Sequence, residues 1–172
     1  MTNHLSNEVF TLSTRVIASA SEKDMLIATA ESCTGGLIGG ALTDIAGSSS
    51  AFDRGFITYS NHAKNEMLGV SMATIKADGA VSSSVAKAMA EGALERSNAH
   101  IAVAVTGIAG PGGGSLEKPV GLVWFGIAVK NKTTICEQHI FADDGREAIR
   151  LQTVHTALSL IQSALLASSC DG

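Results

Sequence analysis

The segment "MLIATAESCTGGLIGG", residues 25–40, joins an apolar run to a Gly-rich helical pattern through a short group of polar side chains. Residues 25–30 predict a buried strand. Residues 34–45 predict a helix, although each internal Gly lowers its propensity by about 1 kcal/mol. A strand that leads directly into a helix is typical of α/β folds, which bind ligands at the carboxyl edge of the sheet.

Strands and helices continue to interleave on both sides of this segment. We expect further strands over residues 52–59, 101–106, 120–130 and 133–141, and further helices over residues 6–20, 61–69, 82–98 and 144–167. A hairpin predicted near residue 131 would reverse the chain direction, so the sheet should be mixed. The pattern predicts one α/β sandwich domain over residues 1–172.

Composition narrows the class of protein. Of the 172 residues, 45% are hydrophobic but only 4% are aromatic, so the core must consist of Ala, Val, Ile and Leu. A formal net charge of −4 argues against general nucleic-acid binding, although a single phosphate could still be held locally. No signal peptide or membrane-length apolar run is visible, and the odd cysteine count (Cys33, Cys136, Cys170) predicts a reducing, cytoplasmic setting.

Two candidate nucleophiles follow the first strand. Ser32 stands where backbone N–H groups at the start of a helix could stabilise an oxyanion. Alternatively, Ser32 or Thr34 only caps that helix, since Ser and Thr are common there. Cys33 has the more easily activated side chain, but a lone cysteine is usually a small buried apolar residue.

The segment "TYSNHAK", residues 58–64, offers a candidate base for a serine nucleophile. Tyr59 ends a strand, and Lys64 falls in the first turn of the next helix. The positive end of the helix dipole, together with burial, would lower the pKa of Lys64 and make its neutral amine accessible. Ser–Lys pairs are a known variant of the catalytic triad. The alternative is a solvated lysine.

None of the five histidines has metal-ligand spacing, and the sequence indicates neither a metal nor a cofactor.

Two further segments could hold an anion. The loop "TGIAGPGGGSLEKPVG", residues 106–121, matches neither a P-loop nor a dinucleotide fingerprint, but its N–H groups could form an anion nest. It could also be a plain hairpin connection. Arg146 and Arg150, four residues apart at the start of the last helix, could together bind a phosphate or carboxylate. The alternative is a solvated, charged helix start.

Taken in order, "AESCTGG", "DIAGSSSAFDRGFITYSNHAK", "GAVS", "AVTGIAGPGGG" and "EKPVGLVWFGIA" closely resemble the CinA C-terminal domain family over about residues 8–166. Its stand-alone members are nicotinamide mononucleotide deamidases. The resemblance implies a three-layer α/β/α sandwich with a mixed, mostly parallel sheet, and a homo-oligomer. It also implies hydrolysis of the carboxamide of nicotinamide mononucleotide, a small-molecule nucleotide, to nicotinate mononucleotide and ammonia.

The resemblance also implies roles for individual residues. Ser32 matches the family nucleophile, and Tyr59 and Lys64 match its activating partners. Backbone N–H groups of the turn after Ser32 would hold the oxyanion. The residues expected to bind substrate are Cys33, Thr34, Gly35, Thr106, Gly107, Gly110, Gly112 and Arg146.

One position departs from the family pattern. The family commonly reads "GAVSE" where this chain reads "GAVSS", so Ser83 replaces a Glu. If that Glu helps to orient the site, activity would be reduced. Two alternatives therefore stay open: a nucleotide-binding regulatory module without turnover, and an amidase that acts on another amide.

Overall fold

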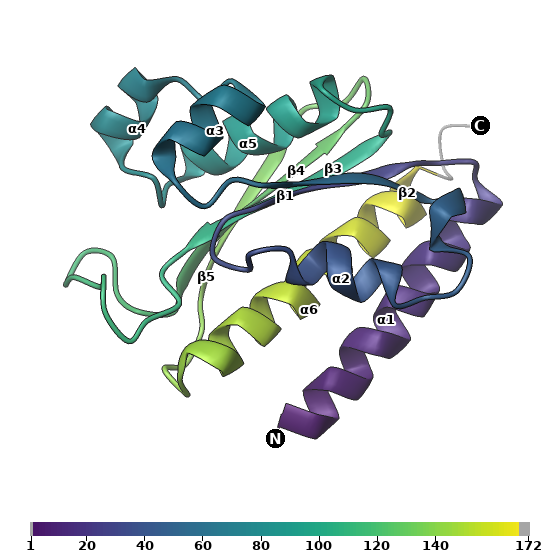
Figure 1. Cartoon of the computed structure of the whole chain (residues 1–172), viewed down its shortest axis with the longest axis horizontal. Helices are drawn as coiled ribbons and strands as arrows, with labels where there is room; N and C mark the ends of the chain where they lie inside the picture. Colours follow the sequence, from purple (N-terminus) through teal and green to yellow (C-terminus); the bar gives the residue numbers. More distant parts are fainter. Residues whose placement is uncertain (1, 169–172) are drawn as a thin grey trace.

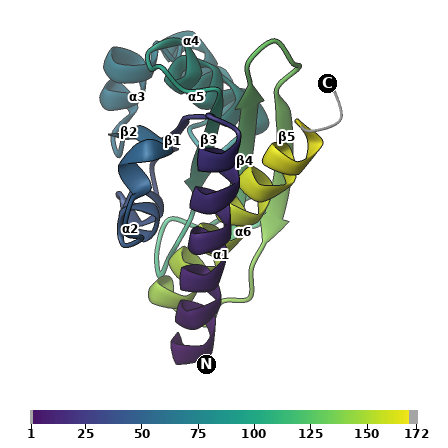
Figure 2. The same cartoon turned by 90° about the vertical axis from the view of Figure 1, so that its right-hand side faces the viewer.

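The computed structural model describes residues 2–168, with side chains from residue 6 onward. It is a three-layer sandwich in which helices cover both faces of one sheet (Figures 1 and 2). The helices are α1 (Thr2–Glu22), α2 (Leu37–Thr43), α3 (Asn61–Leu68), α4 (Met72–Asp78), α5 (Ser83–Glu95) and α6 (Arg146–Ala167), with a 3₁₀ turn at Ser48–Ser50. The strands are β1 (Ile27–Glu31), β2 (Phe52–Ile57), β3 (Ile101–Gly107), β4 (Leu122–Val129) and β5 (Ile135–Ile140).

The sheet has the strand order β2-β1-β3-β4-β5. Strand β1 pairs in parallel with both β2 and β3, whereas β4 is antiparallel to β3 and β5. Four of the five strands therefore point in one direction, and β4 alone among the described strands runs against them. This confirms the mixed, mostly parallel sheet that the sequence and the family resemblance predict. Because β1, β2 and β3 are parallel, the segments that follow them meet at one edge of the sheet.

The two faces of the sheet are packed differently. Large apolar side chains such as Ile27, Val103 and Phe125 face α1, α2 and α6. The opposite face presents mainly alanines, such as Ala28 and Ala102, to α3, α4 and α5. Small side chains let α5 lie close to the sheet, which explains how a core with so few aromatic residues is still closely packed.

The elements occur in the predicted order, with some differences at their ends. Helix α2 begins at Leu37 rather than at residue 34, because the preceding residues form a tight turn with two glycines at positive φ, Gly35 and Gly36. Helix α4 was not predicted as a separate element. Cys170 lies outside the described residues. Within the described part of the chain, none of the helices has the length and hydropathy needed to cross a bilayer.

Candidate active site

Ser32 and Lys64 meet at the sheet edge where β1 and β2 end. The Nζ atom of Lys64 lies 2.9 Å from Oγ of Ser32. Ser32 directly follows β1, and Lys64 lies in the first turn of α3, whose N-cap is Ser60. The backbone N–H of Ser32 donates to the carbonyl of Val105 at 3.1 Å, which ties the start of the turn to β3. The predicted Ser–Lys pair is therefore formed.

Lys64 is almost completely enclosed. Only 1% of the residue is exposed, and its Nζ also donates to the carbonyl of Thr58 at 2.9 Å. The pKa of Lys64 is lowered because burial disfavours the charged ammonium, and only a nearby Cys33 thiolate would oppose this effect. Among the described residues, no carboxylate forms a salt bridge with it. The alternative of a solvated lysine is wrong, and this environment favours the neutral amine that a general base requires.

Cys33 points into the core rather than acting as a second nucleophile. It is 6% exposed and packs in the same apolar cluster as Ile38 and Ile149. Burial raises the pKa of the Cys33 thiol to about 11. Since the thiolate is the nucleophilic form, this environment disfavours attack by the Cys33 sulfur near neutral pH.

The turn after Ser32 is held from two directions. The Glu31 carboxylate, 1% exposed, accepts hydrogen bonds from the Thr34 hydroxyl (2.6 Å) and from the N–H groups of Gly36 (3.0 Å), Ile38 (3.0 Å) and Gly39 (2.8 Å). Arg150 on α6 donates to the carbonyls of Cys33 (3.1 Å) and Thr34 (2.9 Å). Glu31, rather than Ser32 or Thr34, therefore satisfies the N–H groups at the start of α2.

This arrangement decides which N–H groups remain available beside Ser32. The N–H of Gly35 donates to the carbonyl of Ser32 at 3.1 Å, so it is already engaged. The N–H groups of Cys33 and Thr34 have no acceptor among the described residues. Cys33 lines the cavity, whereas Thr34 is fully buried outside its lining, so of the three donors considered for an oxyanion the Cys33 N–H is the one that can donate to a ligand oxygen.

Tyr59 and Arg146 form the outer wall of the site. The Arg146 guanidinium donates to the Tyr59 hydroxyl at 2.9 Å and to the carbonyl of Gly110 at 2.8 Å. Tyr59 is 60% exposed. Its contact with Lys64 runs through its backbone carbonyl, which lies 3.5 Å from Nζ.

The remaining wall comes from the segment between α4 and α5. The Thr106 hydroxyl at the end of β3 donates to the carbonyl of Ala80 at 2.8 Å. Lys118, in the Gly-rich loop, donates to the carbonyls of Asp78 (2.7 Å) and Val81 (2.9 Å). The loop is therefore more than a hairpin connection, because it anchors the segment that faces Ser32.

These groups surround one cavity of about 220 Å³. Its lining residues are Ser32, Cys33, Tyr59, Asn61, Lys64, Ala80, Val81, Thr106, Gly107, Ala109 and Arg146. Seven of the sequence-predicted site residues are among them. Thr34, Gly35, Gly110 and Gly112 are not: Thr34 is buried beneath the turn, Gly110 contributes a carbonyl to Arg146, and Gly112 is exposed.

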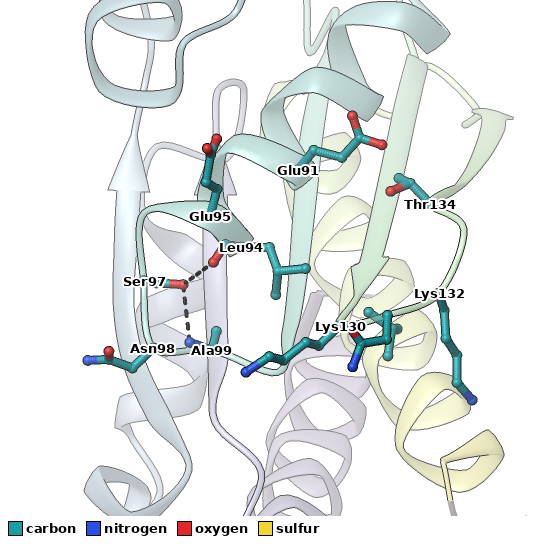
Figure 3. A pocket seen from close by; sticks show the side chains of 11 residues that line it. Glu91, Leu94, Glu95, Ser97, Asn98, Ala99, Lys130, Lys132 and Thr134 are labelled. Carbon is teal, nitrogen blue, oxygen red and sulfur yellow. Dashed lines mark hydrogen bonds between the residues drawn. The ribbon is translucent and has the colours of Figure 1, made fainter. Parts of the chain in front are cut away.

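A larger pocket, about 560 Å³, lies far from Ser32 between the end of α5 and the β4–β5 connection (Figure 3). Its side chains include Glu91, Glu95 and Lys130, but it contains neither a paired nucleophile and base nor a buried ionisable group. No group of three or more His, Cys, Asp or Glu residues gathers into a metal-binding cluster among residues 6–168, whose side chains the structure describes. The cavity at Ser32 is therefore the candidate active site.

Sequence reasoning missed several residues at this site. The sequence assigns no role in it to Glu31, Asn61 or Lys118, and it pairs Arg150 with Arg146 as an anion binder. The structure separates these two arginines, because Arg150 holds the nucleophile turn and Arg146 faces the cavity. The sequence signal that could have identified Glu31 is its position: it is an acidic residue directly before Ser32.

Comparisons with known proteins identify the family of this chain. The model of the CinA C-terminal domain matches residues 9–165. The nicotinamide-nucleotide amidohydrolase PncC of Enterobacter agglomerans is 53% identical over 154 residues, covering 90% of this chain and 92% of the relative. The protein of the same name from Escherichia coli (strain K12) is 46% identical over 160 residues, covering 93% and 96%.

The fold is also found among solved structures. The crystal structure of the competence/damage inducible protein CihA from Agrobacterium tumefaciens matches with a TM-score of 0.89 and 53% identity, over 92% of this chain and 95% of that one. The family model covers nearly all of the described residues, including both members of the Ser32–Lys64 pair. This chain belongs to the CinA C-terminal domain family.

Proposed function

We propose that the protein is a nicotinamide-nucleotide amidohydrolase that converts nicotinamide mononucleotide to nicotinate mononucleotide and ammonia, with Ser32 as the nucleophile. Two relatives that carry this activity in their names are 53% and 46% identical over about nine-tenths of the chain. The observation that carries the mechanism is the contact between Ser32 Oγ and the buried amine of Lys64 at 2.9 Å.

In the acylation step, neutral Lys64 takes the hydroxyl proton while Ser32 Oγ attacks the carboxamide carbon. The carbonyl oxygen gains negative charge, and the N–H group of Cys33, which lines the cavity, donates to it. The tetrahedral intermediate then breaks its C–N bond. The proton carried by Lys64 passes to the leaving nitrogen, and ammonia departs.

Deacylation repeats these roles with water. Lys64 removes a proton from a water molecule that attacks the ester carbon, and the proton then returns to Ser32 Oγ as the acid product leaves. Arg146 and the Tyr59 hydroxyl, at the cavity wall, would contact the polar part of the substrate. Their hydrogen bonds fix the positions of both groups, which favours a binding role for Tyr59 over proton transfer to Lys64.

A regulatory module without turnover is the second candidate, because Ser83 replaces the Glu that the family commonly has. Ser83 begins α5, and its carbonyl accepts a contact from the Cys136 thiol at 3.7 Å. It is not among the residues that line the cavity around Ser32. The replacement therefore does not alter the Ser32–Lys64 pair, and the enzyme remains the better proposal.

The direct test is to incubate the purified protein with nicotinamide mononucleotide and to measure both ammonia and nicotinate mononucleotide. Wild type should release the two products in equal amounts, and Ser32→Ala should release neither. Tight binding of the nucleotide without product would favour the regulatory module. Release of ammonia from other carboxamides, but not from this one, would favour a different amidase.

Two broader expectations are also proposed. The cysteine count favours a cytoplasmic protein, which cell fractionation would test. The family resemblance favours a homo-oligomer, which light scattering during size-exclusion chromatography would test.

A further inference from the structure

One wall of the Ser32 cavity is the short segment between α4 and α5, residues 79–82. Ala80 and Val81 of this segment are partly exposed and line the cavity beside Ser32. Helix α4, which leads into the segment, has only Ile75 buried among its seven residues. Because so few buried contacts leave a segment free to open locally, this wall needs other contacts to keep its position.

Lys118 supplies such contacts from the end of the Gly-rich loop. Its Nζ atom donates to the carbonyls of Asp78 at 2.7 Å and Val81 at 2.9 Å, 40 and 37 residues earlier in the sequence. The Thr106 hydroxyl, at the end of β3, donates to the carbonyl of Ala80 at 2.8 Å. The end of α4 and the start of α5 are thus tied together, and the wall between them is fixed to the sheet.

The site of the Lys118 amine is shaped for a close approach. Gly79 has a φ of +80°, and a Cβ on it would lie 2.8 Å from Nζ of Lys118. Any side chain at residue 79 would therefore push the amine away from its carbonyl partners. Among the described residues, no carboxylate forms a salt bridge with Lys118. Its charge is directed at backbone carbonyls, and such charge-assisted hydrogen bonds are stronger than neutral ones.

We propose that Lys118 is a positioning residue for substrate binding, because it holds the wall formed by Ala80 and Val81 in place beside Ser32. The apolar side chains of this wall would pack against the ring of the nucleotide. Lys118 is not itself among the residues that line the cavity, so it acts through the wall. The Ser32–Lys64 pair belongs to other elements and does not depend on it. This inference rests on the proposed function.

The test separates binding from turnover in the full-length chain. Ammonia release at increasing concentrations of nicotinamide mononucleotide gives KM and kcat for wild type, Lys118→Met and Lys118→Arg. Calorimetry gives the Kd of the same nucleotide for Ser32→Ala, with and without Lys118→Met. Lys76→Met, which removes an exposed lysine of α4, is the matched control.

We expect Lys118→Met to raise both KM and Kd about 10-fold and to change kcat by less than about threefold, because the wall binds ground state and transition state alike. Lys118→Arg should keep part of the binding. It retains the charge and the donors, but a guanidinium is broader than the ammonium that fits against Gly79. The pH midpoint on the acid side should stay unchanged, because the Ser32–Lys64 pair is intact.

Gly79→Ala disturbs the same contact from the opposite side. It should raise KM as Lys118→Met does, by displacing the amine. Gly47→Ala controls for backbone strain, since Gly47 has a φ of +82° but an added Cβ there would meet nothing within 4 Å. This control should leave KM unchanged. In the Lys118→Met background, Gly79→Ala should raise KM little further, because residues in contact show non-additive effects.

Three results would overturn the inference. One is a wild-type KM for Lys118→Met. Another is a pair of KM effects, from Lys118→Met and Gly79→Ala, that simply multiply in the double variant. The third is a fall in kcat with a shifted pH midpoint, which would indicate damage at the Ser32–Lys64 pair. Binding of nicotinamide mononucleotide without ammonia release, or turnover of another carboxamide instead, would refute only the proposed activity or substrate. The Kd or KM measured with that ligand would then decide the role of Lys118.

Discussion

The amine of Lys64 reaches Ser32 Oγ from a different strand–helix unit, 32 residues later in the chain, at a distance of 2.9 Å. Strands β1 and β2 are adjacent and parallel, so the segments after them lie side by side. The carbonyl of Thr58 receives a second hydrogen bond from the same amine. Neighbouring backbone thus holds the buried amine of Lys64 beside Ser32, as its proposed role as a base requires.

Lys64→Met should abolish catalysis without unfolding the protein. Methionine has a similar length but no amine, so ammonia release should fall by about 10²- to 10⁴-fold, the usual contribution of a general base. The free energy of unfolding should not decrease much, because the variant replaces a buried amine, whose burial is costly, with an apolar side chain of similar length. An ammonia assay and thermal unfolding measure the two effects, and the exposed Lys76→Met is the control. Substantial turnover by Lys64→Met would contradict the Ser–Lys mechanism.

Activity should decline on the acid side of its pH profile. The pKa of Lys64 is lowered by burial, and only the neutral amine can accept the proton of Ser32. The value of kcat/KM should therefore increase with pH through this lowered pKa and then level off. A profile that stays flat down to the onset of acid unfolding, monitored in parallel by circular dichroism, would show that another group is the base.

The same shift should be visible in stability. Between the lowered folded pKa of Lys64 and the unfolded value of about 10.4, the unfolded chain binds more protons, so the free energy of unfolding rises with pH. At pH values below this window, Lys64 is charged in both states, and burial of its ammonium lowers the free energy of unfolding by its full amount. Any stability advantage of Lys64→Met over wild type in urea titrations should therefore shrink as pH rises through the window.

Replacement of the two adjacent candidate nucleophiles should give opposite results. Ser32→Ala should remove ammonia release, whereas Cys33→Ala should keep most of it and cost about 1 kcal/mol of stability for a smaller core side chain. Because the pKa of Cys33 is raised to about 11, iodoacetamide at neutral pH should leave the enzyme active. Rapid inactivation that substrate prevents would return Cys33 to consideration.

The order and type of most elements could be predicted because their apolar periodicity is strong. Strand β1 is buried along its whole length, and the apolar positions of α1 and α5 recur with helical spacing. Helix α4 escaped prediction since only Ile75 of its seven residues is buried. Seven residues span only about two turns, which is too short for a helical period to be recognised.

Site residues could be predicted where the signal lies in the nearby sequence, but not where their position depends on contacts between distant segments of the chain. Ser32 and Lys64 stand at recognisable chain positions, after a strand and in the first turn of a helix. Arg150 shows no such signal: a charged residue near a helix start usually faces solvent, and only the packing of α6 against the turn brings it to Cys33. The Arg146–Tyr59 contact, 87 residues apart, depends on tertiary structure in the same way.

Two glycines offer a matched test of the close approach between sheet and helix. A Cβ on Gly126 of β4 would lie 2.4 Å from the carbonyl oxygen of Ala86 in α5, whereas a Cβ on Gly40 of α2 would meet nothing within 4 Å. Gly126→Ala should therefore lower the free energy of unfolding by about 1–3 kcal/mol. Gly40→Ala should raise it by about 0.5–1 kcal/mol through helix propensity. Equal effects in urea unfolding would contradict this packing.

Glu31→Gln tests whether the carboxylate organises the nucleophile turn. Four donors, the Thr34 hydroxyl and the N–H groups of Gly36, Ile38 and Gly39, converge on the two carboxylate oxygens. This arrangement requires the ionised, acceptor-only form. A glutamine would place its NH₂ group against at least one of these donors and would remove the charge that stabilises the start of α2.

We therefore expect Glu31→Gln to lose about 2–4 kcal/mol in the free energy of unfolding, the combined cost of an unsatisfied buried group and a lost charge. Ammonia release should also fall, because Ser32 directly follows this residue and the turn after it would relax. Glu66→Gln, on the exposed side of α3, should change stability by no more than about 0.5 kcal/mol. If the two variants unfold at the same urea concentration, the carboxylate does not organise the turn.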